Sequence, residues 1–205
     1  TVVCPICGKN TPLVNNWWLH KKKKIRLNYE LIDGNIVYEI IENGDIQEGN
    51  IKRYQVSCLY CSSKIEYKHI VEDISKNERE IILAVYLDNR KFELPTKDDR
   101  KAIKNANKYL KNNIKELSRF IPIEPIPSDI NAARYLKYWY RLYSPRQLVV
   151  LTSLCKEIRI IVEQLSKEDR DYASAIGTYL SMILTKHVNY NSRCTVWHNG
   201  IKAIG

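Results

Sequence analysis

Cys4-Pro5-Ile6-Cys7-Gly8 and Cys58-Leu59-Tyr60-Cys61-Ser62 are two C-x-x-C motifs, and they set the fold of the first third of the chain. Two residues between cysteines let the backbone turn tightly, so that both sulfurs face one metal ion. Four thiolates fill the tetrahedral shell of Zn²⁺ and leave no position for water. The motifs therefore predict a structural zinc site with the ligands Cys4, Cys7, Cys58 and Cys61. The two remaining cysteines stand alone in the sequence, which favours a zinc site with two free thiols over a disulfide framework.

The long segment between the cysteine pairs has the pattern of β-strands. The apolar-rich runs from Ile25 to Ile32 and from Ile36 to Ile41 flank Asp33-Gly34, a dipeptide typical of hairpin turns. A further strand is expected from Ile51 to Ser57. We therefore predict a β-rich zinc module over residues 1–70, with a hairpin arm inserted between the two cysteine pairs. Because the metal closes so long a loop, it should supply a substantial part of the module's stability.

Residues 71–127 are predicted to form a second hairpin, from Ile81 to Leu87 and from Lys91 to Leu94, followed by a helix. Thr96 begins a capping box that opens this helix. Its apolar face is expected to contain Ile103, Ala106, Leu110, Ile114 and Leu117. The closely spaced Pro122, Pro125 and Pro127 end the helix and form a stiff connector, so a domain boundary is expected there.

Residues 128–205 are predicted to be a helical module. Ser144-Pro145-Arg146-Gln147 is a capping box with proline at the first helical position. The apolar stripe of that helix is Leu148, Leu151, Cys155, Ile158, Val162 and Leu165. Ser166 to Asp169 should cap a second helix, with the stripe Tyr172, Ile176, Leu180, Ile183 and His187. The two helices should form an antiparallel hairpin, and the fold class of the whole chain is α+β.

The chain carries a formal net charge of +10, which favours a polyanionic partner such as nucleic acid. Two segments are candidates for that contact. The first follows Trp17-Trp18 and consists of Lys21, Lys22, Lys23, Lys24 and Arg26. On a hairpin arm these cations could reach DNA phosphates. The alternative is a solvated β edge that lysines protect against aggregation.

The second segment is residues 134–146, in which basic and aromatic side chains interleave. This pairing can hold a nucleic-acid backbone while rings stack on bases. The candidate contacts are Arg134, Lys137, Tyr138, Arg141 and Arg146. In the alternative interpretation Tyr135, Trp139 and Tyr143 pack into the helical hairpin and the charges face solvent.

The sequence lacks the motifs of several functional classes. No stretch approaches the roughly 20 apolar residues of a membrane span, and no signal peptide is recognisable, so we expect a cytoplasmic protein without a membrane partner. The sequence has no G-x-G-x-x-G or Walker loop and no Pro-Pro-Tyr motif of amino-methyltransferases. No catalytic residue is predicted, and this segment alone is not expected to be an enzyme.

Several motifs, taken in order, resemble a known family. They are Cys4-Pro5-x-Cys7-Gly8 with Trp17-Trp18-Leu19, then Leu94-Pro95-Thr96, Ile121-Pro122-x-Glu124-Pro125-Ile126-Pro127, Trp139-x-x-Leu142-Tyr143-x-Pro145-Arg146-Gln147-Leu148, and Asn191-x-Arg193-Cys194 with Trp197. The series resembles a family of archaeal and bacterial adenine-specific DNA methylases that contain a zinc ribbon. The inner loop from Lys21 to Arg53 matches no motif of that family.

The resemblance implies that this chain is an internal segment, between the S-adenosylmethionine loop and the Pro-Pro-Tyr motif of a larger methyltransferase. A metal ligand so near the first residue agrees with that expectation. S-adenosylmethionine would then be a cofactor of the parent enzyme only. The expected partners are DNA and the remaining domains of the parent. Two alternatives stay open: a structural scaffold that docks on the rest of the methyltransferase, and a free-standing RNA-binding zinc ribbon.

Overall fold

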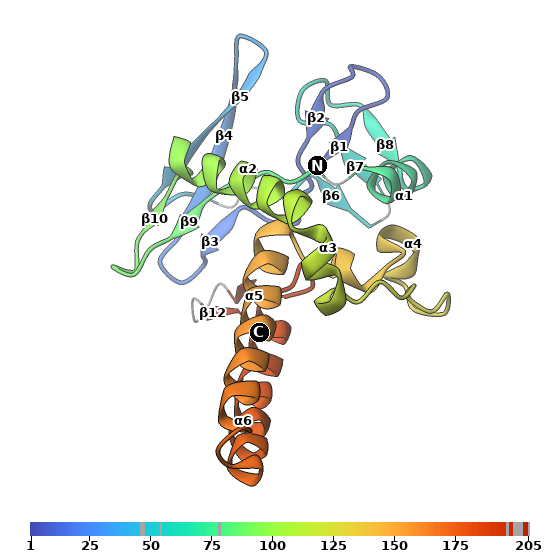
Figure 1. Ribbon diagram of the computed structural model, residues 1–205. Helices are drawn as coiled ribbons and strands as arrows, with labels where there is room; N and C mark the ends of the chain where they lie inside the picture. Colours follow the sequence, from blue (N-terminus) through green and yellow to red (C-terminus); the bar gives the residue numbers. More distant parts are fainter. Residues whose placement is uncertain (46–47, 54, 78, 196, 199–202, 205) are drawn as a thin grey trace. The chain divides into compact units, whose positions relative to one another are not determined.

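The computed structural model describes residues 1–45, 48–53, 55–77, 79–195, 197–198 and 203–204. The chain forms two compact units, the first mainly from residues 1–98 and 128–136, the second mainly from residues 99–127 and 137–197. Small antiparallel sheets with a cysteine cluster come first along the chain, and a helical hairpin lies near its end (Figure 1). The predicted α+β class is confirmed.

The core of the zinc module is built from short strands and one helix. The strands β1 (Val2–Val3) and β2 (Asn10–Thr11) pair antiparallel, β6 (Ile51–Lys52), β7 (Gln55–Ser57) and β8 (Lys64–Glu66) form a second sheet, and helix α1 (Tyr67–Lys76) follows. Buried side chains from all three parts form one apolar cluster with the first cysteine of each pair: Val2, Cys4, Val56, Cys58, Ile65 and Ile70. Cys4 and Cys58, two of the four predicted metal ligands, are therefore part of a hydrophobic core.

The hairpin arm is the sheet β3 (Trp18–His20), β4 (Ile25–Ile32) and β5 (Asn35–Ile41). The register pairs Ile32 with Asn35, which leaves Asp33 and Gly34 as a two-residue turn, and both have positive φ. This is the geometry that Asp-Gly favours, so the predicted hairpin is confirmed. A second cluster of Val14, Trp17, Leu27 and Leu59 lies under this sheet. Since Leu59 belongs to the second cysteine motif, the arm packs directly on the zinc module.

Two smaller elements complete the first unit. The predicted hairpin after residue 80 is present but short, with β9 (Val85–Tyr86) paired to β10 (Phe92–Glu93). Helix α4 (Ala133–Leu136) lies against α1, where the Tyr67 and Tyr135 hydroxyls are 2.5 Å apart and the rings meet edge to face. Residues distant in sequence are thus joined to the zinc module by an aromatic contact.

The second unit is helical. Its elements are α2 (Lys97–Asn112, which begins at the end of the first unit), α3 (Ile114–Leu117), the 3₁₀ turns η1 (Ser118–Phe120) and η2 (Trp139–Leu142), α5 (Pro145–Leu165) and α6 (Arg170–Tyr190). In the tail, β11 (Trp197–His198) pairs with β12 (Ala203–Ile204). The helix predicted as far as Leu117 is interrupted at Asn113, whose side chain donates to the carbonyl of Tyr109. The Asn113 amide donates to the same carbonyl at 3.0 Å, but the residue has φ −108° and ψ 14°, outside the helical range, and so breaks the helix.

The proline-rich segment makes backbone contacts of its own. The Ile126 amide donates to the carbonyl of Lys137 at 2.8 Å, and the Tyr140 amide donates to that of Pro122 at 3.2 Å. Because proline offers no amide, this segment contributes mainly carbonyl acceptors to the pairing. The stretch is therefore held against residues 137–140 within the second unit.

The helices α5 and α6 form the predicted antiparallel hairpin, and the capping box at Ser144 is present with both of its hydrogen bonds. The predicted cap segment of α6, Ser166 to Asp169, is confirmed, and of the predicted stripe Ile176 and Leu180 are half-buried, whereas Tyr172, Ile183 and His187 are exposed. Asp169, the last residue of that segment, caps α6 by accepting from the amides of Asp171 and Tyr172, and Ser166, the first, ends α5.

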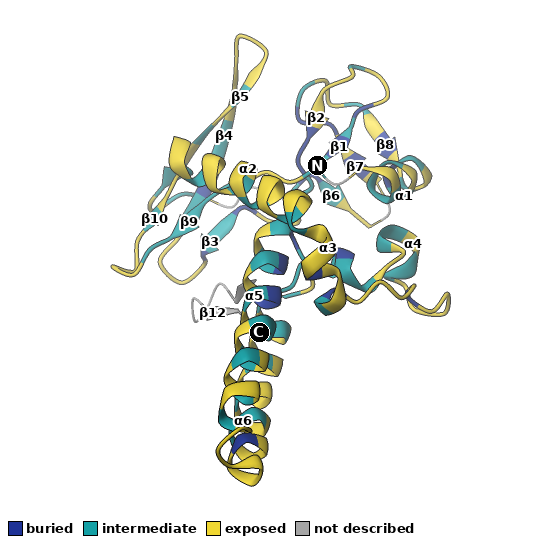
Figure 2. Ribbon diagram, viewed as in Figure 1, coloured by how far each residue is buried: buried dark blue, intermediate teal, exposed yellow. Residues whose placement is uncertain are grey.

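Where α6 packs on α5 it carries the buried Ala173 and Gly177, which has no side chain. A Cβ on Gly177 would lie 2.9 Å from Val162 Cγ2, so the two helices approach closely at this point. Even the Cβ of alanine would crowd Val162 at this position, so the contact requires glycine, and the large side chains of Tyr172 and Ile183 lie elsewhere on the helix and are exposed. In Figure 2 much of this hairpin is exposed.

None of the helices in the described part of the chain is long and apolar enough to cross a membrane.

Candidate metal centre

The four cysteines of the two motifs converge on one point. Their Sγ atoms all lie within 4.8 Å of one another. The Cys4–Cys61 and Cys7–Cys58 sulfur pairs, each joining the two motifs, are both 3.7 Å apart. A tetrahedral zinc ion with Zn–S bonds of about 2.3 Å separates its sulfurs by about 3.8 Å. The thiol positions are therefore compatible with a structural Zn²⁺ site.

The two motifs have the same local geometry. In each, the amide of the first cysteine donates to the carbonyl five residues later, and the amide four residues later donates back, all at 2.9 Å. The residues at that fourth position, Gly8 and Ser62, both have positive φ, at 70° and 58°. Glycine adopts this conformation without strain, whereas serine adopts it at a cost. The tight turn that brings two sulfurs together is thus built twice, from two different sequences.

Burial divides the ligands in the same way in both motifs. Cys4 and Cys58 are 0% and 2% exposed, while Cys7 is half-buried and Cys61 is exposed. Each motif therefore fixes one sulfur in the core and holds the other at the surface. All four positions of a tetrahedral ion are taken by thiolates, so the arrangement can bind a metal firmly but offers no open coordination site for chemistry.

Burial and hydrogen bonds to sulfur shift the pKa values of the thiols in different directions. Burial raises the pKa of the Cys4 thiol, but bonds from the Ser63 hydroxyl and from the backbone of Cys7 and Ile6 outweigh it and lower the pKa to about 6. At Cys58 burial dominates and raises the pKa to about 12. Ser63 also lowers the pKa of the Cys61 thiol, whose sulfur lies 3.0 Å from its hydroxyl. Ser63 contacts one sulfur from each motif and supports the thiolate form of both.

Three further residues hold the motifs in place, and sequence patterns gave no signal for them. The buried hydroxyl of Thr11 accepts from the Leu59 amide at 3.0 Å, which joins β2 to the second motif. Buried Asn50 accepts from the Val14 amide and donates to the carbonyls of Pro12 and Ser57. Asp73 of α1 accepts from the Val3 amide, one residue before Cys4. These are lone polar residues in sequence, and only the fold shows that each bridges distant segments.

The predicted cations Lys21 to Lys24 form the turn between β3 and β4, where the Lys24 amide donates to the carbonyl of Lys21 at 3.1 Å. All four side chains are exposed, and we call this segment the lysine turn. None of the four forms an ion pair with any residue that the structure describes. Arg26, on β4, is half-buried and donates to Asn28 Oδ1. The lysine turn therefore presents four uncompensated positive charges at the end of the arm.

Trp17, next to the lysine turn in sequence, is a core residue. Its side chain is 2% exposed, its indole donates to the carbonyl of Glu48 at 3.1 Å, and its ring lies 5.0 Å from that of Tyr29. The aromatic part of this segment thus supports the arm, and only the basic part is available to a partner.

The second candidate segment divides into exposed and buried members. Lys137 and Arg146 are exposed in the second unit, as is Tyr138, whose ring stacks on that of Tyr140 at 5.8 Å. Arg134 is exposed on α4 in the first unit. Arg141 is only 7% exposed, and its carbonyl accepts from the Arg193 guanidinium. A buried guanidinium cannot reach a phosphate without rearrangement, so Arg141 serves the packing of the second unit in this conformation.

A cavity of about 1360 Å³ lies beside the lysine turn in the first unit. Lys23 lines it together with Arg90 and Lys91 of the β9–β10 turn, and with the rings of Tyr86 and Phe92. Glu42 and Asp88 line it too. Arg90 and Lys91 add two exposed cations to the charge of the lysine turn, which the sequence did not reveal because they lie far along the chain.

No family model, curated protein or solved structure matches the chain.

Proposed function

We propose that this chain is a non-catalytic, DNA-binding segment of a larger adenine-specific DNA methyltransferase, folded around a structural zinc ion. Cys4, Cys7, Cys58 and Cys61 would hold the metal, since their spacing fits a tetrahedral thiolate site. The zinc would secure the module from which the arm extends. The methylase assignment rests on the ordered motifs of the sequence, and S-adenosylmethionine would be bound elsewhere in the parent.

The observation that carries the DNA-binding part is the lysine turn. Four neighbouring ammonium groups repel one another, and no carboxylate among the described residues pairs with them. A DNA backbone supplies the missing negative charge and releases its condensed counterions when the lysines bind. Arg134, Lys137, Tyr138 and Arg146 are exposed and would supplement this contact. The turn is fixed to the zinc module through Trp17 and Leu27, so the charges are presented on an ordered support.

We expect duplex DNA binding to weaken steeply with salt, and the change of Lys21, Lys22, Lys23 and Lys24 to glutamine to reduce that dependence. Each phosphate contact contributes about 0.9 to the slope of log K against log salt, so the slope should fall by roughly 2 to 4. Fluorescence anisotropy of a labelled duplex between low and moderate salt measures both quantities.

A matched control removes the same charge from dispersed positions. Lys64, Lys68, Lys167 and Lys186 are exposed, and their change to glutamine also lowers the formal net charge by four, from +10 to +6. If this control weakens binding as much as the lysine-turn variant, net charge and not the turn is responsible. A preference for RNA over duplex DNA would instead support the alternative of an RNA-binding zinc ribbon.

The scaffold alternative is favoured by a different observation, an apolar face on the helical hairpin. On α6, Tyr179 is 67% exposed and Ile183 is 56% exposed, and Tyr172 and Tyr190 lie on the same face. From Tyr172 to Thr185 the helix has no charged residue. A face of this kind is typical of a protein–protein contact, and the remaining domains of the parent methyltransferase are the partner that we propose for it.

Docking predicts that the Tyr179→Ser and Ile183→Ser changes act only in the presence of the partner. In this chain alone, substitution of exposed residues should shift the free energy of unfolding by about 0.5 kcal/mol or less. In a longer polypeptide that contains the neighbouring domains, the same pair should lower stability by several times that amount. Chemical denaturation of both forms gives the comparison, and equally small effects in both would contradict docking.

A further inference from the structure

Helix α2 carries lysines at a regular helical spacing. They follow one another at intervals of four, three, four and three residues: Lys97, Lys101, Lys104, Lys108 and Lys111. Because an α-helix repeats every 3.6 residues, this spacing places all of them on one face. We call this face the lysine stripe. It shares no residue with the lysine turn.

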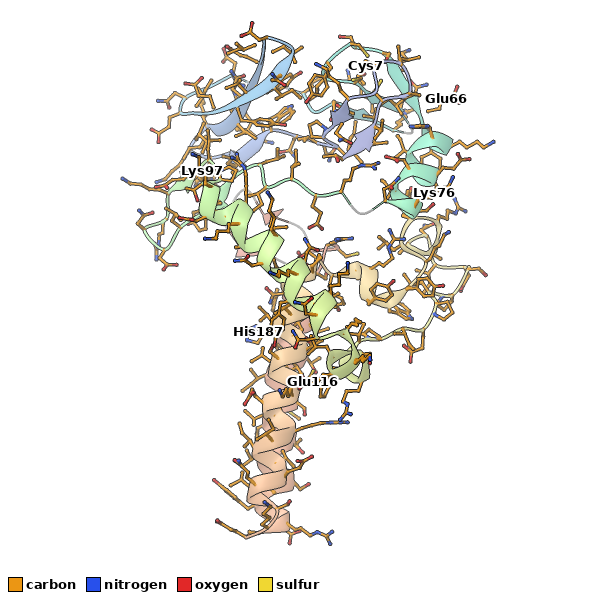
Figure 3. All side chains as sticks on the ribbon, turned by 45° about the horizontal axis from the view of Figure 1, so that its top comes forward. Cys7, Glu66, Lys76, Lys97, Glu116 and His187 are labelled. Carbon is orange, nitrogen blue, oxygen red and sulfur yellow. The ribbon has the colours of Figure 1, made fainter. Side chains whose placement is uncertain are left out.

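The lysine stripe is exposed along its whole length. Figure 2 shows α2 exposed over most of its turns, and Figure 3 shows Lys97 in the first of them. The opposite side of the helix carries Ile103, Ala106 and Leu110, which are half-buried. The amphipathic pattern therefore uses the apolar side for packing and leaves the lysines to solvent.

The stripe lacks the charge pairing of an ordinary solvated helix. Exposed helices commonly place glutamate four residues before lysine, and such pairs attract one another. In α2 each lysine instead has another lysine as its neighbour on the face, which is repulsive. The acids of the helix, Asp98 and Asp99, lie in its first turn, and no acidic residue follows from Arg100 to Asn112. Over the part of the chain that the structure describes, no stripe lysine is in an ion pair.

The shape of the stripe selects the kind of anion. The ammonium groups are strung along a helix of 16 residues, which is about 24 Å long. They do not converge, so a small anion would meet only one or two of them. A nucleic-acid duplex presents a continuous row of phosphates, and about 24 Å corresponds to about seven base pairs. The stripe also contains no aromatic ring, so it offers charge to a backbone and no stacking surface to unpaired bases.

We propose that the exposed face of α2 is a contact surface for the phosphate backbone of double-stranded nucleic acid. It acts in addition to the lysine turn and reads no sequence, because lysines on phosphates fix position without distinguishing bases. Binding relieves the repulsion along the stripe, since each ammonium group gains a negative neighbour.

The test changes Lys101, Lys104, Lys108 and Lys111 of the full chain to glutamine and measures binding of a 20-base-pair duplex over a range of salt. Glutamine has nearly the helix propensity of lysine, so α2 should persist, and circular dichroism checks this. The salt slope should fall by roughly 2 to 4 and the affinity at low salt by at least about tenfold. The dispersed variant of Lys64, Lys68, Lys167 and Lys186 serves as the charge-matched control.

The outcomes separate this surface from the one proposed above. If the stripe variant binds the duplex as tightly as the unsubstituted chain while the lysine-turn variant does not, the stripe inference is overturned and the proposed function stands. A loss in the stripe variant alone supports the stripe and moves the DNA contact away from the turn. Equal loss in the stripe variant and the dispersed control overturns the inference. If the stripe variant loses binding to anionic lipid vesicles that the unsubstituted chain binds, while its duplex binding is unchanged, the stripe inference is overturned in favour of a membrane-contacting surface.

Discussion

The Cys4→Ser and Cys58→Ser variants are expected to lose zinc and to leave residues 1–76 without a cooperative unfolding transition. Both sulfurs are buried in the cluster formed by Val2, Val56 and Ile65, so each change removes a metal ligand and a core side chain together. Structural zinc sites supply on the order of 10 kcal/mol of apparent binding free energy, which exceeds the usual net stability of a small domain. Atomic absorption measures the zinc content, and calorimetry follows the transition.

The chain contains its own control for this experiment. Cys155 and Cys194 lie outside the four-cysteine cluster, so the Cys155→Ser and Cys194→Ser variants should keep one zinc ion per chain and an unchanged first transition. Removal of zinc from the unsubstituted chain with a chelator should reproduce the effect of Cys4→Ser. A Cys4→Ser protein that is metal-free yet still folded over its first unit would refute a structural role for the metal.

The second large effect is expected from Trp17→Ala, at about 3–5 kcal/mol of lost stability. The substitution removes a buried indole that contacts Tyr29 and Tyr38 and that donates a hydrogen bond to the carbonyl of Glu48. The adjacent Trp18 is half-buried, so Trp18→Ala should cost clearly less. Urea denaturation of the two variants makes the comparison. Similar losses at both positions would mean that the arm is not organised around Trp17.

The sequence was sufficient where a local rule governs the structure. Asp33-Gly34 requires a tight turn, Ser144 and Gln147 cap a helix by themselves, and two residues between cysteines dictate a knuckle. These features depend on neighbours in the chain, so they were predicted correctly. The convergence of the four sulfurs also agrees with the prediction from their spacing.

Other features depended on segments that meet only in the folded chain. Ser63, Asn50 and Asp73 support the cysteine motifs through hydrogen bonds to distant residues, and no pattern marks them. The apolar stripe of α6 was predicted correctly only in part, because apolar residues occur on two faces of that helix. The face of α6 that packs on α5 is determined by the position of glycine, since only Gly177 can lie so close to Val162. The lysine stripe follows from the spacing of its residues, but the exposure of all five lysines depends on how α2 packs in the folded chain.

The close approach at Gly177 places two different demands on α6. Position 177 faces α5 and must stay small or it forces the helices apart, whereas Tyr172, Tyr179 and Ile183 are each more than half exposed. Related chains should therefore keep glycine at position 177 and be free to exchange their outward side chains. Under the proposed docking, the outward side chains would vary with the partner surface that each chain contacts. Comparison of these side chains among related chains would then reveal a change of partner even where the fold is the same.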